Sequence, residues 1–164
     1  CVVLVQDAFT RYFDARVPAS LIELAARLGY SVFLARFMPN GKPLHVQGFL
    51  GPFARAARRN AALLNSLADC GVPLVGLDPA MTLVYRQEYR KAGDLRPPQV
   101  LLPQEWLLRA TQGLEKAPLR ADAGYRLLAH CTEKTHVAAS SSDFGKVRTM
   151  VSRPTGIIIA APTP

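Results

Sequence analysis

The stretch from Val72 to Tyr89 constrains the fold more than any other, because it joins a short apolar run directly to a helix start. Residues 74–77 are apolar and are typical of a strand buried on both faces. Asp78 then occupies the position of a helix N-cap, and Pro79 occupies the first helical position, where a missing N–H costs nothing. A strand that leads into a capped helix is half of a βαβ unit. The carboxyl ends of such strands are where open α/β sheets bind ligands.

The same alternation of strand and helix extends along most of the chain. Strands are predicted at residues 2–6, 30–36, 73–77 and 125–129, and helices are predicted to open at Pro18, Pro52, Pro79 and Pro103, with a weak helix over 143–150. Residues 8–16 are expected to form a loop or a short turn of helix, and residues 38–48, which contain PNGKP, a loop. This alternation predicts an α/β fold with a Rossmann-like, doubly wound, mainly parallel sheet and helices on both faces.

Length and composition favour one domain in a reducing compartment. The 164 residues are predicted to form a single α/β domain, residues 1–164. No stretch approaches the roughly 20 apolar residues that a membrane helix needs, so at most peripheral membrane association is expected. The three cysteines, Cys1, Cys70 and Cys131, do not make a disulfide framework, and a cytoplasmic location is expected. Because the chain opens at Cys1 without an initiator Met, we expect it to be a piece of a longer protein.

The formal net charge of +8 calls for a test of nucleic-acid binding. The clustered cations either form a phosphate-binding face or simply keep two helix faces solvated. No interleaved aromatic residues, basic tail or helix-turn-helix spacing accompany them, so no nucleic-acid partner is expected. Docking onto an acidic partner or a larger parent protein explains the charge equally well. The cations concerned are Arg55, Arg58 and Arg59 on one predicted helix and Arg86, Arg90 and Lys91 on another.

Polar side chains follow three of the predicted strands at the point where each strand ends. These residues are Asp7, Asp78 and His130, the last followed by Cys131. The carboxyl ends of parallel strands share one edge of a sheet, so these side chains are predicted to line a common crevice at the strand tips. The loop at residues 38–43 is expected to join them there.

The residues at this crevice do not match the sequence motifs of common cofactor, catalytic or metal sites. The turn after the first strand lacks G-x-G-x-x-G, so no dinucleotide site is predicted. The Asp78 carboxylate would compete with a phosphate for the helix N–H groups, and no G-x-S-x-G elbow is present. His130 and Cys131 could form a thiolate pair only if the loop bends, since adjacent strand residues point to opposite faces. The cysteines offer no C-x-x-C pairing for a metal. We therefore predict no catalytic residue and no cofactor site within this chain.

Four stretches of the chain resemble one group of enzymes. They are VQDAFTRYFD at 5–14, GKPLHVQGFLGPFARAARRN at 41–60, VPLVGLDPAMTLVYRQEY at 72–89 and HCTEKT at 130–135. In order and spacing they resemble the C-terminal part of FAD-linked oxidases of the D-2-hydroxyacid dehydrogenase type (D-lactate, glycolate and D-2-hydroxyglutarate dehydrogenases). That part carries a cysteine-rich iron–sulfur module of the CCG type, shared with the heterodisulfide reductase B subunit.

The resemblance implies a role in electron transfer. Electrons would pass from a flavin through an iron–sulfur cluster to an acceptor. The implied partners are the flavin domain of the parent protein and an electron-acceptor protein. FAD and the cluster would then belong to the parent protein, with the FAD and substrate sites outside this chain.

The chain also departs from the family pattern. The family loop after the second strand often has C-C-G-R-P where this chain has PNGKP, and the central tip often has E-P-S-C where this chain has DPAM. Asn40 and Met81 are therefore interpreted as degenerate cluster positions, because an amide and a thioether do not replace thiolates. Cys131 matches a ligand position of the second cysteine set and is interpreted as a remnant cluster ligand. No G-C-C-G-M-A-G run follows it, so residues 136–164 are expected to be truncated, frame-shifted near Lys146, or naturally divergent.

Two functional classes remain open from the sequence. The first is the C-terminal module of a flavin- and iron–sulfur-dependent oxidoreductase that oxidises a D-2-hydroxyacid. In that class the chain serves as an electron-transfer scaffold that lacks most of its own cluster ligands. The second class is a stand-alone, non-catalytic α/β binding module whose basic face engages an acidic partner.

Overall fold

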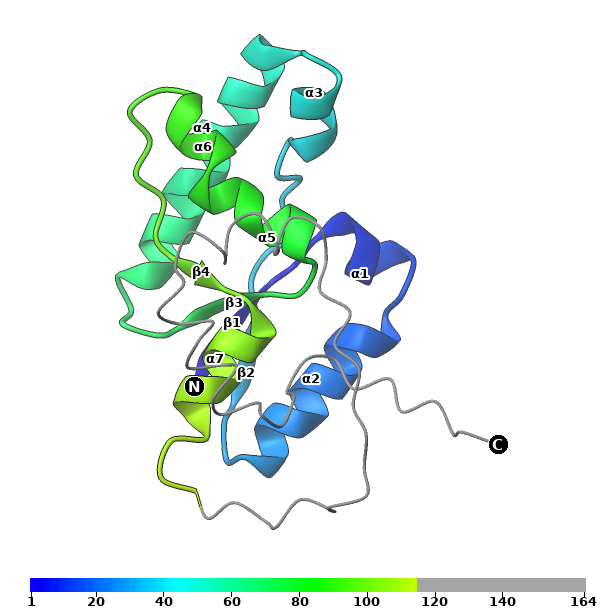
Figure 1. Cartoon of the computed structure of the whole chain (residues 1–164), viewed down its shortest axis with the longest axis vertical. Coiled ribbons are helices and arrows are strands. Elements are labelled where there is room, and N and C mark those ends of the chain that lie inside the picture. The colour runs from blue at the N-terminus through cyan, green and yellow to red at the C-terminus, as the bar shows by residue number, and fades with distance from the viewer. Residues whose placement is uncertain (115–164) are drawn as a thin grey trace, which may run out of the picture. The chain divides into compact units, whose positions relative to one another are not determined.

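The computed structural model describes residues 1–114, of which residues 1–111 are organised around one sheet (Figure 1). Its centre is a four-stranded sheet in the order β2-β1-β3-β4, with every neighbouring pair parallel. The strands are β1 (Val2–Val5), β2 (Val32–Leu34), β3 (Leu74–Gly76) and β4 (Val100–Leu101). All four residues of β1 are buried, as expected for a central strand that is covered on both faces.

Helices connect the strands in the alternating order that a parallel sheet requires. Their bounds are α1 (Ala8–Tyr12), α2 (Arg16–Arg27), α3 (Lys42–Val46), α4 (Leu50–Ala68), α5 (Pro79–Arg86), α6 (Glu88–Lys91) and α7 (Pro103–Ala110). In the described part of the chain, no helix is both long enough and apolar enough to cross a membrane.

Each face of the sheet has its own apolar core. Val3 and Val5 of β1 pack with residues of α4, α5 and α6 on one face. Val2 and Leu4 point to the opposite face, where they pack with residues of α2 and α7, including Trp106. The alternation along β1 therefore divides the helices into two layers, and this arrangement makes the sheet doubly wound (Figure 1).

The strand order reverses between β1 and β3. The chain runs from β1 outward to β2, and then returns through α4 to β3 on the other side of β1. In doubly wound sheets, ligands bind outside the carboxyl ends of the strands at such a reversal. The carboxyl ends of β1 and β3, which lead into Asp7 and Asp78, therefore mark the position of the candidate site.

The structure confirms the predicted α/β fold with a parallel sheet and helices on both faces. Two local predictions are wrong. Residues 42–46 form helix α3 inside the predicted loop 38–48, because Gly41 turns the chain with φ +79° and Pro43 then fits the first helical turn. Residues 100–101 form an additional strand that was not predicted.

Several predictions concern residues outside the described part of the chain. They are the strand at 125–129, the helix at 143–150 and the tail at 136–164. The proposal of one domain over residues 1–164 includes these residues and stays a prediction.

Candidate functional site

Two carboxylates cap helices at the strand reversal. Asp7 follows β1, and its side chain accepts a hydrogen bond of 2.9 Å from the Thr10 backbone N–H and one of 2.6 Å from the Thr10 hydroxyl. Asp78 follows β3, and its Oδ1 accepts a hydrogen bond of 2.8 Å from the Met81 backbone N–H. Both carboxylates therefore satisfy N–H groups that the first turn of a helix leaves without partners.

The end of β3 lies very close to the helix that follows it. A Cβ atom at Gly76 would clash with the Thr82 hydroxyl and would lie 3.0 Å from the Thr82 methyl carbon. Thr82 itself is 2% exposed, so it has little room to move. Glycine at position 76 lets α5 begin directly against the sheet, and this places Met81 over the strand tips.

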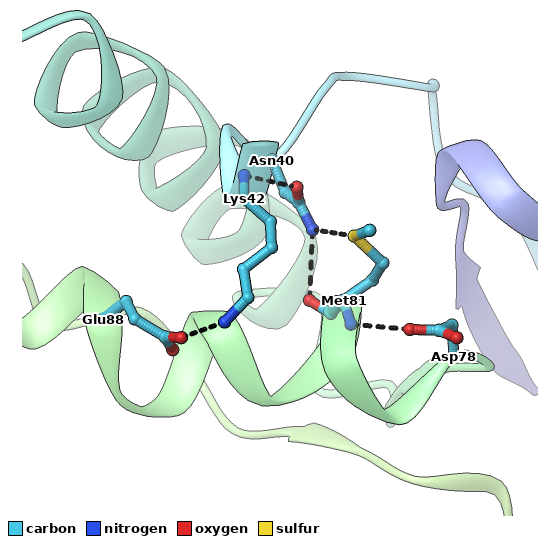
Figure 2. A network of polar contacts seen from close by, with 5 residues as sticks. All are labelled: Asn40, Lys42, Asp78, Met81 and Glu88. Carbon is cyan, nitrogen blue, oxygen red and sulfur yellow. Dashed lines mark hydrogen bonds and ion pairs between the residues drawn. The ribbon is translucent and has the colours of Figure 1, made fainter. Parts of the chain in front are cut away.

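Asn40 connects the segment after β2 to α5. Its side-chain amide Nδ2 lies 3.1 Å from the Met81 carbonyl oxygen and 3.3 Å from the Met81 sulfur (Figure 2). Its Oδ1 accepts a hydrogen bond of 3.0 Å from the Lys42 backbone N–H. Both Asn40 and Met81 are 7% exposed. The amide therefore has partners for donor and acceptor in a buried position, as buried polar groups require.

A second contact joins the same two segments. The Lys42 ammonium forms an ion pair with Oε1 of Glu88 at the start of α6, and the two side chains are 21% and 13% exposed (Figure 2). Within residues 1–114, the other Glu88 oxygen has no hydrogen-bond partner although it is buried. Removing the Lys42 charge alone would leave the Glu88 carboxylate buried without compensation, which is costly.

Two tyrosines lie beneath this network. The Tyr89 hydroxyl donates a hydrogen bond of 2.8 Å to the Asn40 carbonyl oxygen, and the rings of Tyr85 and Tyr89 pack edge to face at 5.2 Å. Burial raises the pKa of the Tyr85 phenol, and the negative charge of Asp7 raises it further, against the effect of the Asn40 side chain. Burial also raises the pKa of Tyr89. Both phenols are therefore neutral at physiological pH and act as hydrogen-bonding and packing groups.

The far end of α5 is fixed by a forked ion pair. The Arg86 guanidinium pairs with both Glu105 carboxylate oxygens, at 2.9 Å for Oε1, and donates to the Val100 carbonyl oxygen at 2.9 Å. Burial favours the protonated form of Glu105, but the hydrogen bonds from Arg86 and from the Leu102 backbone N–H outweigh it and lower the pKa of this carboxyl. Arg86 is therefore used inside the fold, and its interpretation as part of an exposed basic face is wrong.

The remaining predicted cations lie on the surface. Arg55, Arg58 and Arg59 of α4 are exposed, as are Arg90 and Lys91 of α6. None of these five forms an ion pair within the described residues.

The side chains at the strand reversal do not fit an iron–sulfur cluster. The amide of Asn40 and the thioether of Met81 contact each other, and neither can bind iron as a thiolate does. In residues 1–114, no three His, Cys, Asp or Glu side chains lie close enough to hold a metal ion. The N-termini of α1 and α5 are occupied by the Asp7 and Asp78 carboxylates, so they do not fit a pyrophosphate either.

The structure brings together most of the predicted site residues that it describes. Asp7 and Asp78 follow adjacent strands at one edge, and Asn40 contacts Met81 there. Cys1 precedes β1 and Cys70 lies between α4 and β3, so both exposed thiols are at the opposite edge. His130 and Cys131 lie outside the described residues. Their assignments, and that of a remnant cluster at this edge, stay predictions.

Sequence reasoning missed three residues of this network. Lys42, Glu88 and Tyr89 connect the segment after β2 to α6. Nothing local marked them, because Glu88 and Tyr89 lie in a stretch rich in charged residues, RQEYRK at 86–91. Nothing in the sequence paired Glu88 with a lysine 46 residues away.

The chain is similar in sequence to part of several longer enzymes. It is 63% identical over 147 residues to the D-2-hydroxyglutarate dehydrogenase of Pseudomonas putida, and the match covers 89% of this chain. It is 40% identical over 148 residues to the enzyme of that name from Escherichia coli, covering 89% of this chain. It is 38% identical over 156 residues to that of Haemophilus influenzae, covering 88%.

The chain spans only a small part of these relatives, 14% of the first two and 15% of the third. No family model and no solved structure matches the chain. The predicted resemblance to D-2-hydroxyacid dehydrogenases is therefore confirmed over most of the chain. These names do not test the cysteine-rich module.

Proposed function

We propose that this chain is a segment of a D-2-hydroxyglutarate dehydrogenase and serves in it as a folded scaffold for electron transfer. The observation that carries the proposal is the 63% identity that extends over 89% of the chain. Because the match covers 89% of the chain, it includes most of the described α/β unit. The substrate and FAD sites would then lie in the six-sevenths of the relative that this chain does not span.

The network at the strand reversal supports a scaffold role. Hydrogen bonds join Asn40 to Met81 and Lys42, and an ion pair joins Lys42 to Glu88. A group that binds or transforms a substrate needs an available donor, acceptor or charge, and within residues 1–114 these side chains are engaged except for one buried oxygen of Glu88. We therefore assign substrate oxidation to the rest of the parent protein.

The experiment that tests the proposed substrate uses the product of the intact gene. Anaerobic reduction of an artificial electron acceptor is followed with D-2-hydroxyglutarate, L-2-hydroxyglutarate and D-lactate. We expect reduction with D-2-hydroxyglutarate at a higher kcat/KM than with the other two acids. No reduction with D-2-hydroxyglutarate, or a preference for D-lactate, would contradict the proposed substrate.

The scaffold role is tested by the iron content of the same intact protein. The variant Met81→Leu removes the thioether sulfur with little change in volume. If Met81 is a degenerate position, this variant keeps the iron content of the wild-type protein. Cys131→Ser should lower it if Cys131 is a remnant ligand. Loss of iron in Met81→Leu would show that the thioether position still takes part in binding a metal.

A stand-alone module with a basic face keeps one supporting observation, the exposed arginines Arg55, Arg58 and Arg59 on α4. The intact gene product decides between the two classes. A protein that oxidises no 2-hydroxyacid but binds an acidic partner through α4 would favour the stand-alone module. Loss of that binding in Arg55→Glu, with no change in Arg27→Glu on α2, would assign it to α4.

A further inference from the structure

Large apolar side chains are exposed along the β2 edge of the sheet. Phe33 and Leu34 of β2 are 58% and 57% exposed, and Tyr12 and Phe13 at the end of α1 are 63% and 82% exposed. We call these four residues the β2-edge surface. Isolated exposed apolar residues are ordinary in soluble proteins, but a group of large ones on neighbouring elements marks an interaction site.

The two parts of this surface adjoin each other. The Tyr12 ring packs edge to face on Phe37, which follows β2, with ring centroids 5.5 Å apart. The Gln6 side chain at the end of β1 donates a hydrogen bond of 2.6 Å to the Ala35 carbonyl oxygen. These contacts join α1 to the carboxyl end of β2, so the exposed side chains of the two elements adjoin at this edge of the sheet.

Neither helix layer covers Phe33 and Leu34 of β2. These residues are in register with Val3 and Leu4 of β1, which point into the two opposite cores and are 7% and 1% exposed. Adjacent strand residues alternate between faces, so the high exposure of Phe33 and Leu34 leaves both faces open at this strand. Within residues 1–114, β2 pairs only with β1, and its outer backbone groups are available to another strand.

We propose that the β2-edge surface is the docking site for the rest of the parent polypeptide, a proposal that rests on the proposed function. Strands of parallel sheets are normally covered on both faces, and this unit lacks the material to cover β2. The Pseudomonas putida relative is much longer than this chain, which spans 14% of it, so the remaining polypeptide is available to cover this surface. The remaining part of the same polypeptide is held next to this unit at high effective concentration by the covalent connection.

The charges around the surface define the complementary face. Arg36, between Leu34 and Phe37, is exposed and forms no ion pair within the described residues. The Arg11 guanidinium lies 5.1 Å from the centre of the Phe37 ring and 5.5 Å from that of Tyr12. The surface of the parent that docks here is therefore apolar at its centre and carries carboxylates opposite these arginines.

Photo-crosslinking in the intact gene product tests the proposal. A benzophenone amino acid replaces Phe33 or Phe13, both exposed, so the unit itself should fold as before. The matched control replaces Arg58, exposed on α4. We expect Phe33 and Phe13 to crosslink within one polypeptide to residues outside this 164-residue segment, and we expect no such product from Arg58.

The other outcomes would overturn the proposal. Crosslinks between two polypeptides would show a second copy on the surface, and crosslinks to residues 115–164 would show that the chain covers it unaided. Crosslinks to added lipid vesicles, or none at all, would exclude the rest of the parent as occupant. The result is independent of substrate, because an intramolecular crosslink in a protein that does not oxidise D-2-hydroxyglutarate keeps this interface and rejects the proposed function.

A second measurement covers the case of low crosslinking yield. In the intact protein, Phe33→Glu should speed amide hydrogen exchange in β2 by about tenfold or more, since local opening becomes easier when a covering surface is lost. Arg58→Glu should leave exchange in β2 unchanged. Equal exchange in wild type and Phe33→Glu would contradict docking at this surface.

Discussion

The Asn40 side-chain amide and the Met81 backbone and sulfur are in direct contact, at 3.1 and 3.3 Å, although 41 residues separate them. This contact joins the segment after an edge strand to the helix after a central one. Both partners are buried, so the contact is shielded from competing water. The Asn40 amide is therefore one of the contacts that fix the geometry of the strand reversal, together with the Lys42–Glu88 ion pair.

Replacement of that amide is the first test of its role. Asn40→Ala removes the donor to Met81 and the acceptor for the Lys42 N–H, which is left without that partner. We expect the free energy of unfolding to fall by about 1–3 kcal/mol, measured by urea denaturation. The control is Asn65→Ala on α4, whose side chain is exposed and should change stability by no more than about 0.5 kcal/mol. Equal effects of the two substitutions would contradict the role assigned to Asn40.

The sequence predicted those parts of the fold that depend on residues adjacent in the chain. The strand before Asp78 and the cap at Asp78 were predictable, because the apolar run, the carboxylate and Pro79 are neighbours in sequence. Helix α3 was not predicted, because PNGKP has the composition of a turn, and Gly41 and Pro43 fit the start of a short helix as well as they fit a loop. Strand β4 has two residues, too few to show a period.

The candidate site was predictable only in part for the same reason. Parallel topology brings Asp7 and Asp78 to one edge whatever their partners, so their convergence followed from the strand pattern. The pairing of Lys42 with Glu88 depends on how α3 and α6 pack together, and no local pattern contains that information. Likewise, the sequence placed Arg86 on a predicted basic face, but in the structure its guanidinium pairs with Glu105.

The two capping carboxylates should differ in their contribution to stability. Asp78→Ala removes one hydrogen bond to a backbone N–H and should cost about 1 kcal/mol. Asp7→Ala removes bonds to both the N–H and the hydroxyl of Thr10 at a buried position, and should cost about 2 kcal/mol. Thermal and urea denaturation measure both. The variants Asp7→Asn and Asp78→Asn keep an acceptor oxygen and should recover most of the loss, and an unchanged midpoint in Asp78→Ala would contradict its structural role.

The close approach of β3 to α5 predicts a specific coupling. Gly76→Ala places a methyl group against the Thr82 hydroxyl and should destabilise the fold by about 1–3 kcal/mol. Thr82→Ala removes both the hydroxyl and the methyl group that the new Cβ would meet. The double variant should therefore be more stable than the sum of the two single effects predicts, which a double-mutant cycle measures. Simple additivity would show that the strain lies elsewhere.

The Glu105 carboxyl should make stability depend on pH in the acid range. Its pKa is lowered in the fold from an ordinary value of 4.5, so the unfolded chain binds the proton first as the pH falls. The stabilisation is complete above the unfolded-state pKa and is lost as the pH falls through the folded-state pKa. Glu105→Gln should flatten this part of the stability profile measured from pH 7 to pH 3. Glu23→Gln, in an exposed pair with Arg27, is the control and should leave the profile unchanged.

Iron reconstitution tests the prediction that this chain alone holds no complete iron–sulfur cluster. A [4Fe–4S] cluster usually takes four thiolates, whereas the chain has three cysteines, and Cys1 and Cys70 lie at the edge of the sheet opposite Asn40 and Met81. After anaerobic incubation with iron and sulfide, followed by desalting, we expect far less than one cluster per chain by iron analysis. Cys70→Ser and Cys131→Ser should be indistinguishable from wild type in this assay. Near-stoichiometric iron with a charge-transfer band that Cys131→Ser abolishes, and Cys70→Ser does not, would show that the ligands have been misassigned.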